Sequence, residues 1–248
     1  MVRAIALLAA CLSGAGYGQS PLGPQFEVAS IKQSAAGSDS SSGIRTGHGR
    51  LDANNVTLMR CILGAYGVGP HQVSGGPEWL NSERFQISAK ADQPINDDAV
   101  LMVMLQGLLA DRFALVFHRE TRIITALVLE VGKNGSKLEK AEGGEASNNT
   151  SNKNSAVTIE SHYTDMDAFA RVLARQTDLP VVNNTGLNGT FNFKLHWIAD
   201  NAKPAEVTAA EGPSLFSAIQ EQLGLRLRSE KSPVEILVIE SVKKPSEN

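Results

Sequence analysis

Five histidines are the residues of this 248-residue chain best suited to acid–base or metal chemistry. None belongs to an H-E-x-x-H motif or to another close metal-ligand spacing, so no metal site is expected. His118, His162 and His196 lie on the polar positions or at the ends of alternating strands, where exposure to solvent is the ordinary outcome. His48 and His71 lie in glycine-rich loops and are the more open candidates for a functional role.

Other signatures of catalysis or cofactor binding are missing from the sequence. It contains no G-x-S-x-G nucleophile elbow and no Walker motif. Glycines are closely spaced over 64–69, but this segment follows an expected helix, whereas a dinucleotide-binding loop follows a strand and opens a helix. Gly67 is therefore interpreted as a helix cap. We predict neither catalytic residues nor a cofactor.

The loop 74–80, Ser-Gly-Gly-Pro-Glu-Trp-Leu, is the best candidate for binding. A tryptophan beside Gly-Gly-Pro could line a ligand groove, but it could also fold back as a lid on the apolar face of a sheet, which is the more ordinary use of a large aromatic. Trp79, Glu78 and the nearby His71 are therefore our candidate binding residues. A hydrolytic site built from His71, Glu78 or His48 is the alternative.

The scaffold that must position these loops is duplicated. Segment 112–130 matches segment 222–240 at apolar strand positions such as Leu115 with Leu225 and Phe117 with Leu227, and Glu230 follows Glu120 by 110 positions. Each copy has an alternating strand, a charged stretch around the glutamate and a second, more apolar strand. This pattern predicts a β-hairpin at the end of each copy.

The whole sequence indicates an α+β fold with two tandem β-α-β-β-α-β-β-like repeats, each a small, mostly antiparallel sheet packed against two helices. We expect a signal peptide at 1–18, a first repeat at 19–131, a polar linker at 132–155 and a second repeat at 156–248. The expected strands are 26–32, 49–53, 85–91, 156–162 and 190–198. The expected helices are 57–66, 97–110, 165–177 and 214–223, with N-terminal caps near Asp97, Asp165 and Ser214. The expected hairpins pair 113–119 with 123–131 and 225–229 with 234–242.

The loop 179–193 joins the first helix of the second copy to its strand, as 69–85 does in the first copy. A phosphate-binding loop precedes a helix, whereas this loop precedes a strand. Gly186 and Gly189 are therefore interpreted as turn glycines, and Asn183, Asn184 and Asn188 as residues that tolerate left-handed or side-chain-capped turns. The loop is expected to be a structural corner and not a site.

The amino terminus has the features of a secretory signal peptide. Arg3 precedes an apolar run over 4–12, and small residues follow up to Gly18. A membrane span needs roughly 20 apolar residues, so this run is too short, and we expect no transmembrane segment after cleavage. Lipidation at Cys11, in a lipobox-like Leu-Ala-Ala-Cys, is the alternative. The mature protein is expected to be exported, either periplasmic or secreted.

Composition excludes other classes of protein. The net charge is −3 and the basic residues do not cluster, so a nucleic-acid surface is not expected. After signal cleavage Cys61 is the only cysteine, so the mature chain has no internal disulfide. Cys61 lies in an expected helix and is interpreted as a small buried apolar residue.

Several segments in fixed order carry a family resemblance: 24–32 (PQFEVASIK), 75–80 (GGPEWL), 85–90 (FQISAK), 117–120 (FHRE), 185–193 (TGLNGTFNF) and 222–225 (QLGL). Together they resemble the exported "soil-associated" family of unknown function, expanded in Acidobacteria such as Solibacter. In some members of that family the domain is attached to a membrane zinc peptidase of the bla-regulator type. Segment 164–182 is also similar to the short N-terminal domains of secretins and TonB-dependent transducers, which are protein–protein adaptors.

These resemblances imply no catalytic residues. We expect an exported, non-catalytic module that binds a protein or a cell-envelope ligand, in the manner of an adaptor or sensor. The alternative is an extracytoplasmic hydrolase with a non-standard site on loops.

Overall fold

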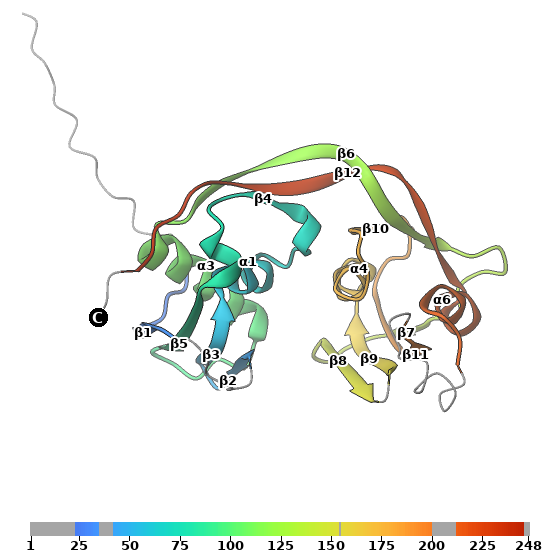
Figure 1. Ribbon diagram of the computed structural model, residues 1–248. Helices are drawn as coiled ribbons and strands as arrows, with labels where there is room; N and C mark the ends of the chain where they lie inside the picture. The colour runs from blue at the N-terminus through green and yellow to red at the C-terminus, as the bar shows by residue number, and fades with distance from the viewer. Residues whose placement is uncertain (1–22, 35–41, 154, 200–211, 246–248) are drawn as a thin grey trace, which may run out of the picture.

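The computed structural model describes residues 23–34, 42–153, 155–199 and 212–245. The expected signal peptide at 1–18, with Cys11, lies outside these residues. Two lobes lie side by side beneath one long two-stranded ribbon (Figure 1). Each lobe is a sheet covered by helices, so the α+β fold class with two small, mostly antiparallel sheets is confirmed.

The first lobe is a four-stranded antiparallel sheet in the order β1-β5-β3-β2. Its core joins alternate residues of the central strands to one face of α1 and α3, including Leu51, Ile87, Ile62 and Phe113, all at most 2% exposed. The elements are β1 (Val28–Gln33), β2 (Gly43–Gly47), β3 (Arg50–Thr57), α1 (Leu58–Tyr66), η1 (Pro70–Gln72), β4 (Val73–Gly75), α2 (Trp79–Ser82), β5 (Arg84–Lys90) and α3 (Asp98–Phe113).

The second lobe repeats this design with the sheet order β7-β11-β9-β8. Phe169, Leu195 and Ile219 are completely buried between the sheet and the helices α4 and α6. The elements are β7 (Glu139–Ala141), β8 (Ser147–Lys153), β9 (Ala156–Thr164), α4 (Met166–Ala174), β10 (Val181–Asn183), β11 (Thr190–Ile198) and α6 (Leu215–Leu223). The predicted caps are confirmed, since Asp97, Asp165 and Ser214 each accept a hydrogen bond from a backbone N–H in the first turn of their helix.

The two predicted hairpins are wrong. Each is one continuous strand, β6 (Val116–Val131) or β12 (Leu225–Ser241), and the two strands pair antiparallel along almost their whole length. A tight hairpin turn favours residues that tolerate positive φ, such as Gly or Asn, and neither 119–122 nor 229–232 contains one. Because β6 pairs with β12 of the other repeat, the same antiparallel hydrogen-bond ladder forms and no tight turn is needed.

The ribbon exchanges strands between the lobes. β6 begins beside the first lobe's core and ends at Val131 in the second lobe, where its Leu129 is buried in the core. β12 begins at Leu225 in the second core and ends with Leu237 and Ile239 in the first. Ile123 pairs with Pro233, 110 positions later, so the axis that relates the two copies passes through the middle of the ribbon. Each repeat therefore completes the core of the other.

The segment that we expected to be a polar linker contains strands. Segment 132–155 contains β7 and β8, which both pair within the second lobe's sheet. All seven residues of β8 are exposed, because it forms an edge of its sheet. The polar composition of β8 thus reflects its edge position. None of the helices in the described part of the chain is long and apolar enough to cross a membrane.

Candidate functional site

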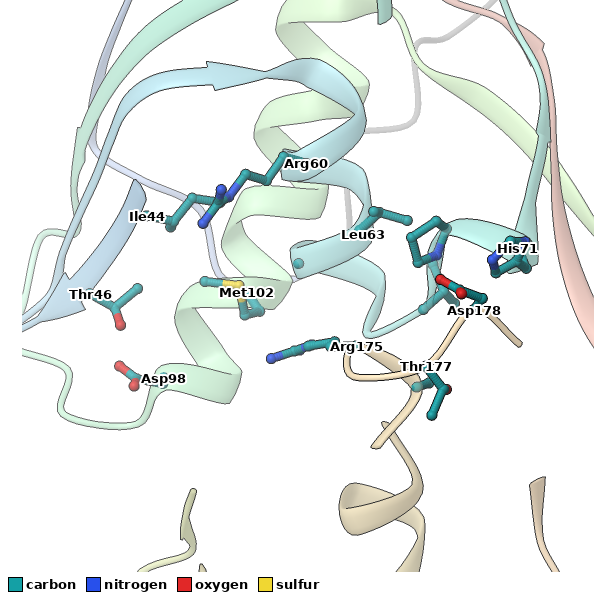
Figure 2. A pocket seen from close by; sticks show the side chains of 14 residues that line it. Ile44, Thr46, Arg60, Leu63, His71, Asp98, Met102, Arg175, Thr177 and Asp178 are labelled. Carbon is teal, nitrogen blue, oxygen red and sulfur yellow. The ribbon is translucent and has the colours of Figure 1, made fainter. Parts of the chain in front are cut away.

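A cleft with a volume of about 650 Å³ lies between the two lobes. The first lobe contributes β2, α1, η1 and the start of α3, and the second lobe contributes the end of α4 and the loop after it (Figure 2). A cavity of this size is within the range of small-molecule sites. The positions of the candidate residues are therefore given relative to this cleft.

Two helices, α1 and α3, position the first-lobe wall of the cleft. Thr57 caps α1 by accepting a hydrogen bond from the backbone N–H of Arg60 at 3.2 Å, which fixes the first turn of that helix. Arg60, Leu63 and Gly64 are spaced three and four residues apart, so they share the helix face that lines the cleft. On α3, Asp98 and Met102 face the cleft by the same i, i+4 spacing.

The second-lobe wall is the turn that ends α4. Its C-cap is Arg175, and Thr177 Oγ1 donates a hydrogen bond to the carbonyl oxygens of Leu173, at 3.2 Å, and Leu179, at 2.9 Å. This small network holds the turn, and Arg175, Thr177 and Asp178 all line the cleft. Their side chains come from the lobe opposite Arg60 and Met102 (Figure 2).

The lobes approach each other closely beside the cleft, where α1 ends. A β-carbon at Gly67 would lie 3.4 Å from Arg171 Cδ, and one at Gly69 would lie 3.8 Å from the β-carbon of Ala174. Gly67 ends α1 with a φ of 62°, which confirms the predicted helix cap. The ends of α1 and α4 thus meet at positions where the first lobe has glycine.

The arginines in and beside the cleft have no counter-ion in the described part of the chain. Among the described residues, no hydrogen-bond acceptor or carboxylate partners the guanidinium of Arg60, Arg171 or Arg175. Desolvation and, second, the nearby charge of Arg171 lower the pKa of Arg175. The carboxylates of Asp98 and Asp178 also line the cleft and have no hydrogen-bonded partner in the described part of the chain. The cleft therefore holds unpaired charges of both signs.

Of the candidate residues chosen from the sequence, the structure brings only His71 to the cleft. His71 is exposed at its edge in η1. Glu78 is exposed at the start of α2, and His48 is exposed in the turn between β2 and β3, and neither lines the cleft. In the described ranges, no group of three or more His, Cys, Asp or Glu side chains could hold a metal ion.

Trp79 lies half-buried against the first lobe's core. Its ring meets Phe85 edge-on with 6.3 Å between centroids, and Lys244 Nζ lies 5.8 Å from its ring centroid. It is positioned as a lid on the core. Cys61 is completely buried in α1, as expected, and burial raises the pKa of its thiol to about 12. A thiol in this state is a poor nucleophile.

Sequence reasoning missed Arg60 and Arg175, the two arginines that line the cleft. They are separated by 115 positions, belong to no motif and do not occupy equivalent places in the two repeats. Only their placement by two different helices brings them to one cavity.

A comparison with protein families matches residues 59–242 to DUF3738, described as a protein of unknown function. The chain belongs to the DUF3738 family. The match begins in α1 and ends just after β12, so the DUF3738 region includes both lobes' helices, the cleft-lining turn after α4 and the whole ribbon. No curated protein and no solved structure matches the chain.

Proposed function

We propose that this DUF3738 protein is a non-catalytic binding module whose ligand site is the cleft between its two lobes. The observation that carries the proposal is that the two repeats jointly build one cavity of about 650 Å³. It is lined by half-buried apolar side chains and by charged groups that have no partner among the described residues. Such a combination is typical of ligand sites, where apolar walls give affinity and a few polar groups give orientation.

The placement of the loop residues supports binding over the hydrolytic alternative. A hydrolytic site requires its acid, base and orienting groups to converge within hydrogen-bond reach of one substrate. Glu78 and His48 lie away from the cleft that His71 borders. The proposal includes export of the protein, supported by the signal-like segment 1–18, and an adaptor or sensor role, supported by the resemblance of segment 164–182 to adaptor domains.

The test uses methionine methyl groups as reporters. Met102 lines the cleft, whereas Met104, on another face of α3, and Met166, in the second lobe, are each 1% exposed. The protein labelled with ¹³C-methyl methionine is titrated with four probes that each contain six carbons: hexanol, hexanoate, hexyl phosphate and hexylammonium. We expect at least one probe to shift the Met102 signal and to leave those of Met104 and Met166 unchanged.

A matched pair of variants makes this test specific. Gly64 faces the cleft, where a β-carbon would lie 3.8 Å from Ile44 Cδ1, so Gly64→Leu fills the cavity. Gly107 is also a helical glycine, with open space around its β-carbon position and no part in this cleft, so Gly107→Leu is the control. Only Gly64→Leu should abolish the shift of Met102. A Met102 signal that none of the four probes moves would overturn the proposed function.

A further inference from the structure

We infer that the ligand of the cleft is a small anionic molecule with an apolar body, and that its anionic group binds at Arg175. The inference rests on the proposed function and adds the chemical class of the ligand. A carboxylate and a phosphate ester would both satisfy it, because a guanidinium binds either group through paired N–H donors.

Arg175 is the best anchor because its position is fixed and its charge is uncompensated. Its backbone N–H donates to the carbonyl oxygens of Val172 and Leu173, so the residue is held at the end of α4. Its side chain extends into the cleft between Met102 and Thr177 (Figure 2). The side chain is exposed to the cleft, so its charge is accessible to an anion that binds there.

The neighbouring cations strengthen this argument. Arg171 precedes Arg175 by four positions, and like charges at that spacing on a helix repel each other. Arg171 also lies next to Gly67, where the two lobes meet beside the cleft. Arg60 adds a third guanidinium from the opposite lobe. A bound anion would reduce the repulsion within α4 and would be attracted to both lobes.

An apolar body is expected because the surfaces around these cations are aliphatic. Ile44, Leu63, Val68 and Met102 line the cleft and are half-buried, so they retain apolar area that a ligand can cover. Covering apolar area contributes about 25 cal/mol per Å². An inorganic anion would leave this area exposed, so we expect it to bind more weakly than an anion with an alkyl chain.

Two carboxylates restrict where the anion can bind. Asp98 lies beside Thr46 at one end of the cleft, and Asp178 lies near His71 at the other (Figure 2). Each repels an anion at its own end, which favours the central position next to Arg175. An ammonium ligand held by these carboxylates is the competing possibility, and the experiment includes it as a separate outcome.

The same four probes test the inference by their rank order. Hexanoate and hexyl phosphate should bind more tightly than hexanol, and hexylammonium should bind most weakly. Comparing hexanoate with hexyl phosphate distinguishes carboxylate from phosphate ligands. Inorganic phosphate tests whether the apolar body matters. Added salt should weaken the two anions and leave hexanol unchanged, because salt screens charges that are partly exposed.

Variants of the arginines identify the anchor. Arg175→Gln should weaken hexanoate about tenfold or more, since a hydrogen bond to a charged group is the strongest class of such bonds. Arg60→Gln should have a smaller effect, and neither variant should change the affinity for hexanol. Arg50→Gln is the matched control, because Arg50 is exposed in the same lobe as Arg60 and does not line the cleft.

The possible failures are distinguishable. If hexanol binds as tightly as hexanoate and Arg175→Gln changes nothing, the anionic ligand is ruled out while the cleft remains a binding site. If hexylammonium binds most tightly and Asp98→Asn or Asp178→Asn weakens it, the ligand is a cation and the inference is wrong. If no probe moves Met102, the proposed function itself fails.

Discussion

Both repeats pair with the central ribbon in the same way, through β4 in the first and β10 in the second. The loops that contain these strands, 69–85 and 179–193, are stabilised by different interactions. In the first lobe, β4 runs parallel to β12 at Leu237–Ile239, and in the second, β10 runs parallel to β6 at Leu127–Leu129. The two docking points are 110 positions apart, as are the repeats. The backbone arrangement is therefore common to both lobes, and the side chains around it have diverged.

The first lobe's corner depends on close packing. Gly75 and Gly76 both have a φ of 79°, and a β-carbon at Gly75 would lie 2.7 Å from the carbonyl oxygen of Ile239. The chain then continues into α2, where Trp79 covers the core. Only residues without a side chain fit this approach to the ribbon.

The second lobe's corner is held by polar side chains. Asn183 Oδ1 accepts hydrogen bonds from the backbone N–H of Thr185 at 3.1 Å and from its Oγ1 at 2.8 Å. Asn183 Nδ2 donates to Asp167 Oδ1 at 2.8 Å, which ties the corner to α4. Gly186 and Gly189 have positive φ, as the turn interpretation predicted. The comparison shows that both corners serve the docking of a lobe, whereas the cavity lies between the lobes.

The largest expected effect tests whether the exchanged ribbon makes the two lobes one folding unit. Phe113 and Phe169 are completely buried, one in each core. Phe113→Ala and Phe169→Ala should each lower the free energy of unfolding by about 3–5 kcal/mol, through lost burial and a cavity. Because each core contains a strand from the other repeat, either variant should destabilise both lobes together.

Each lobe has its own tryptophan, which makes this measurable. Trp79 lies in the first lobe and Trp197, 3% exposed, lies in the second. Urea unfolding is followed by the fluorescence of Trp79 in a Trp197→Phe background, and of Trp197 in a Trp79→Phe background. Coincident midpoints are expected. Two midpoints, with only the mutated lobe shifted, would show that the ribbon does not couple the lobes.

The exchange itself could not be read from the sequence. The alternation of apolar and polar residues predicted the strand segments in 112–130 and 222–240. The same alternation is expected whether a strand pairs with its neighbour or with a segment 110 positions away, so it could not identify the partner strand. Local signals did predict local features: Asp97 and Asp165 are caps, and Gly67 ends α1. The cleft depends on the exchange, since its lining residues extend from Ile44 to Asp178, and no local pattern connects them.

A smaller effect is expected at the equivalent helix starts of the two lobes. Thr57 caps α1 and Asp165 caps α4, 108 positions apart, and each side chain accepts one backbone N–H, at 3.2 Å and 2.7 Å respectively. Replacing such a cap by alanine costs about 0.5–2 kcal/mol. Asp165→Ala should cost more than Thr57→Ala, because a carboxylate also interacts favourably with the positive end of the helix dipole.

Urea unfolding at low and at high salt separates these contributions. The excess cost of Asp165→Ala should shrink at high salt, while the cost of Thr57→Ala should stay constant. Asp165→Asn keeps the acceptor and removes the charge, so it should behave like the wild type at high salt. An equal cost of the two alanine variants at low salt would contradict a charge contribution at α4.

The smallest effect concerns the glutamates at the two ends of the ribbon. Glu130 accepts hydrogen bonds from Arg226 Nη2 at 2.7 Å and Arg228 Nη2 at 3.1 Å. Its equivalent, Glu240, lies 2.8 Å from Nδ1 of His118, and both of those side chains are about half exposed. Hydrogen bonds from Arg228 and then from Arg226 lower the pKa of Glu130. The second-lobe end of the ribbon therefore carries the stronger ion pair.

A lowered pKa in the folded state sets the sign of the pH dependence. Glu130 adds stability above its ordinary pKa of about 4.3, and this contribution is lost as pH falls through the lower pKa of the folded protein. Glu130→Gln should therefore lower the melting temperature at pH 7 and change it less and less below pH ~4.3. Glu240→Gln, at an exposed pair, should cause a smaller change at pH 7. Melting curves of both variants from pH 7 to pH 3 check this order, and a cost of Glu130→Gln that persists undiminished at pH 3 would show that its ionised form is not what stabilises the ribbon.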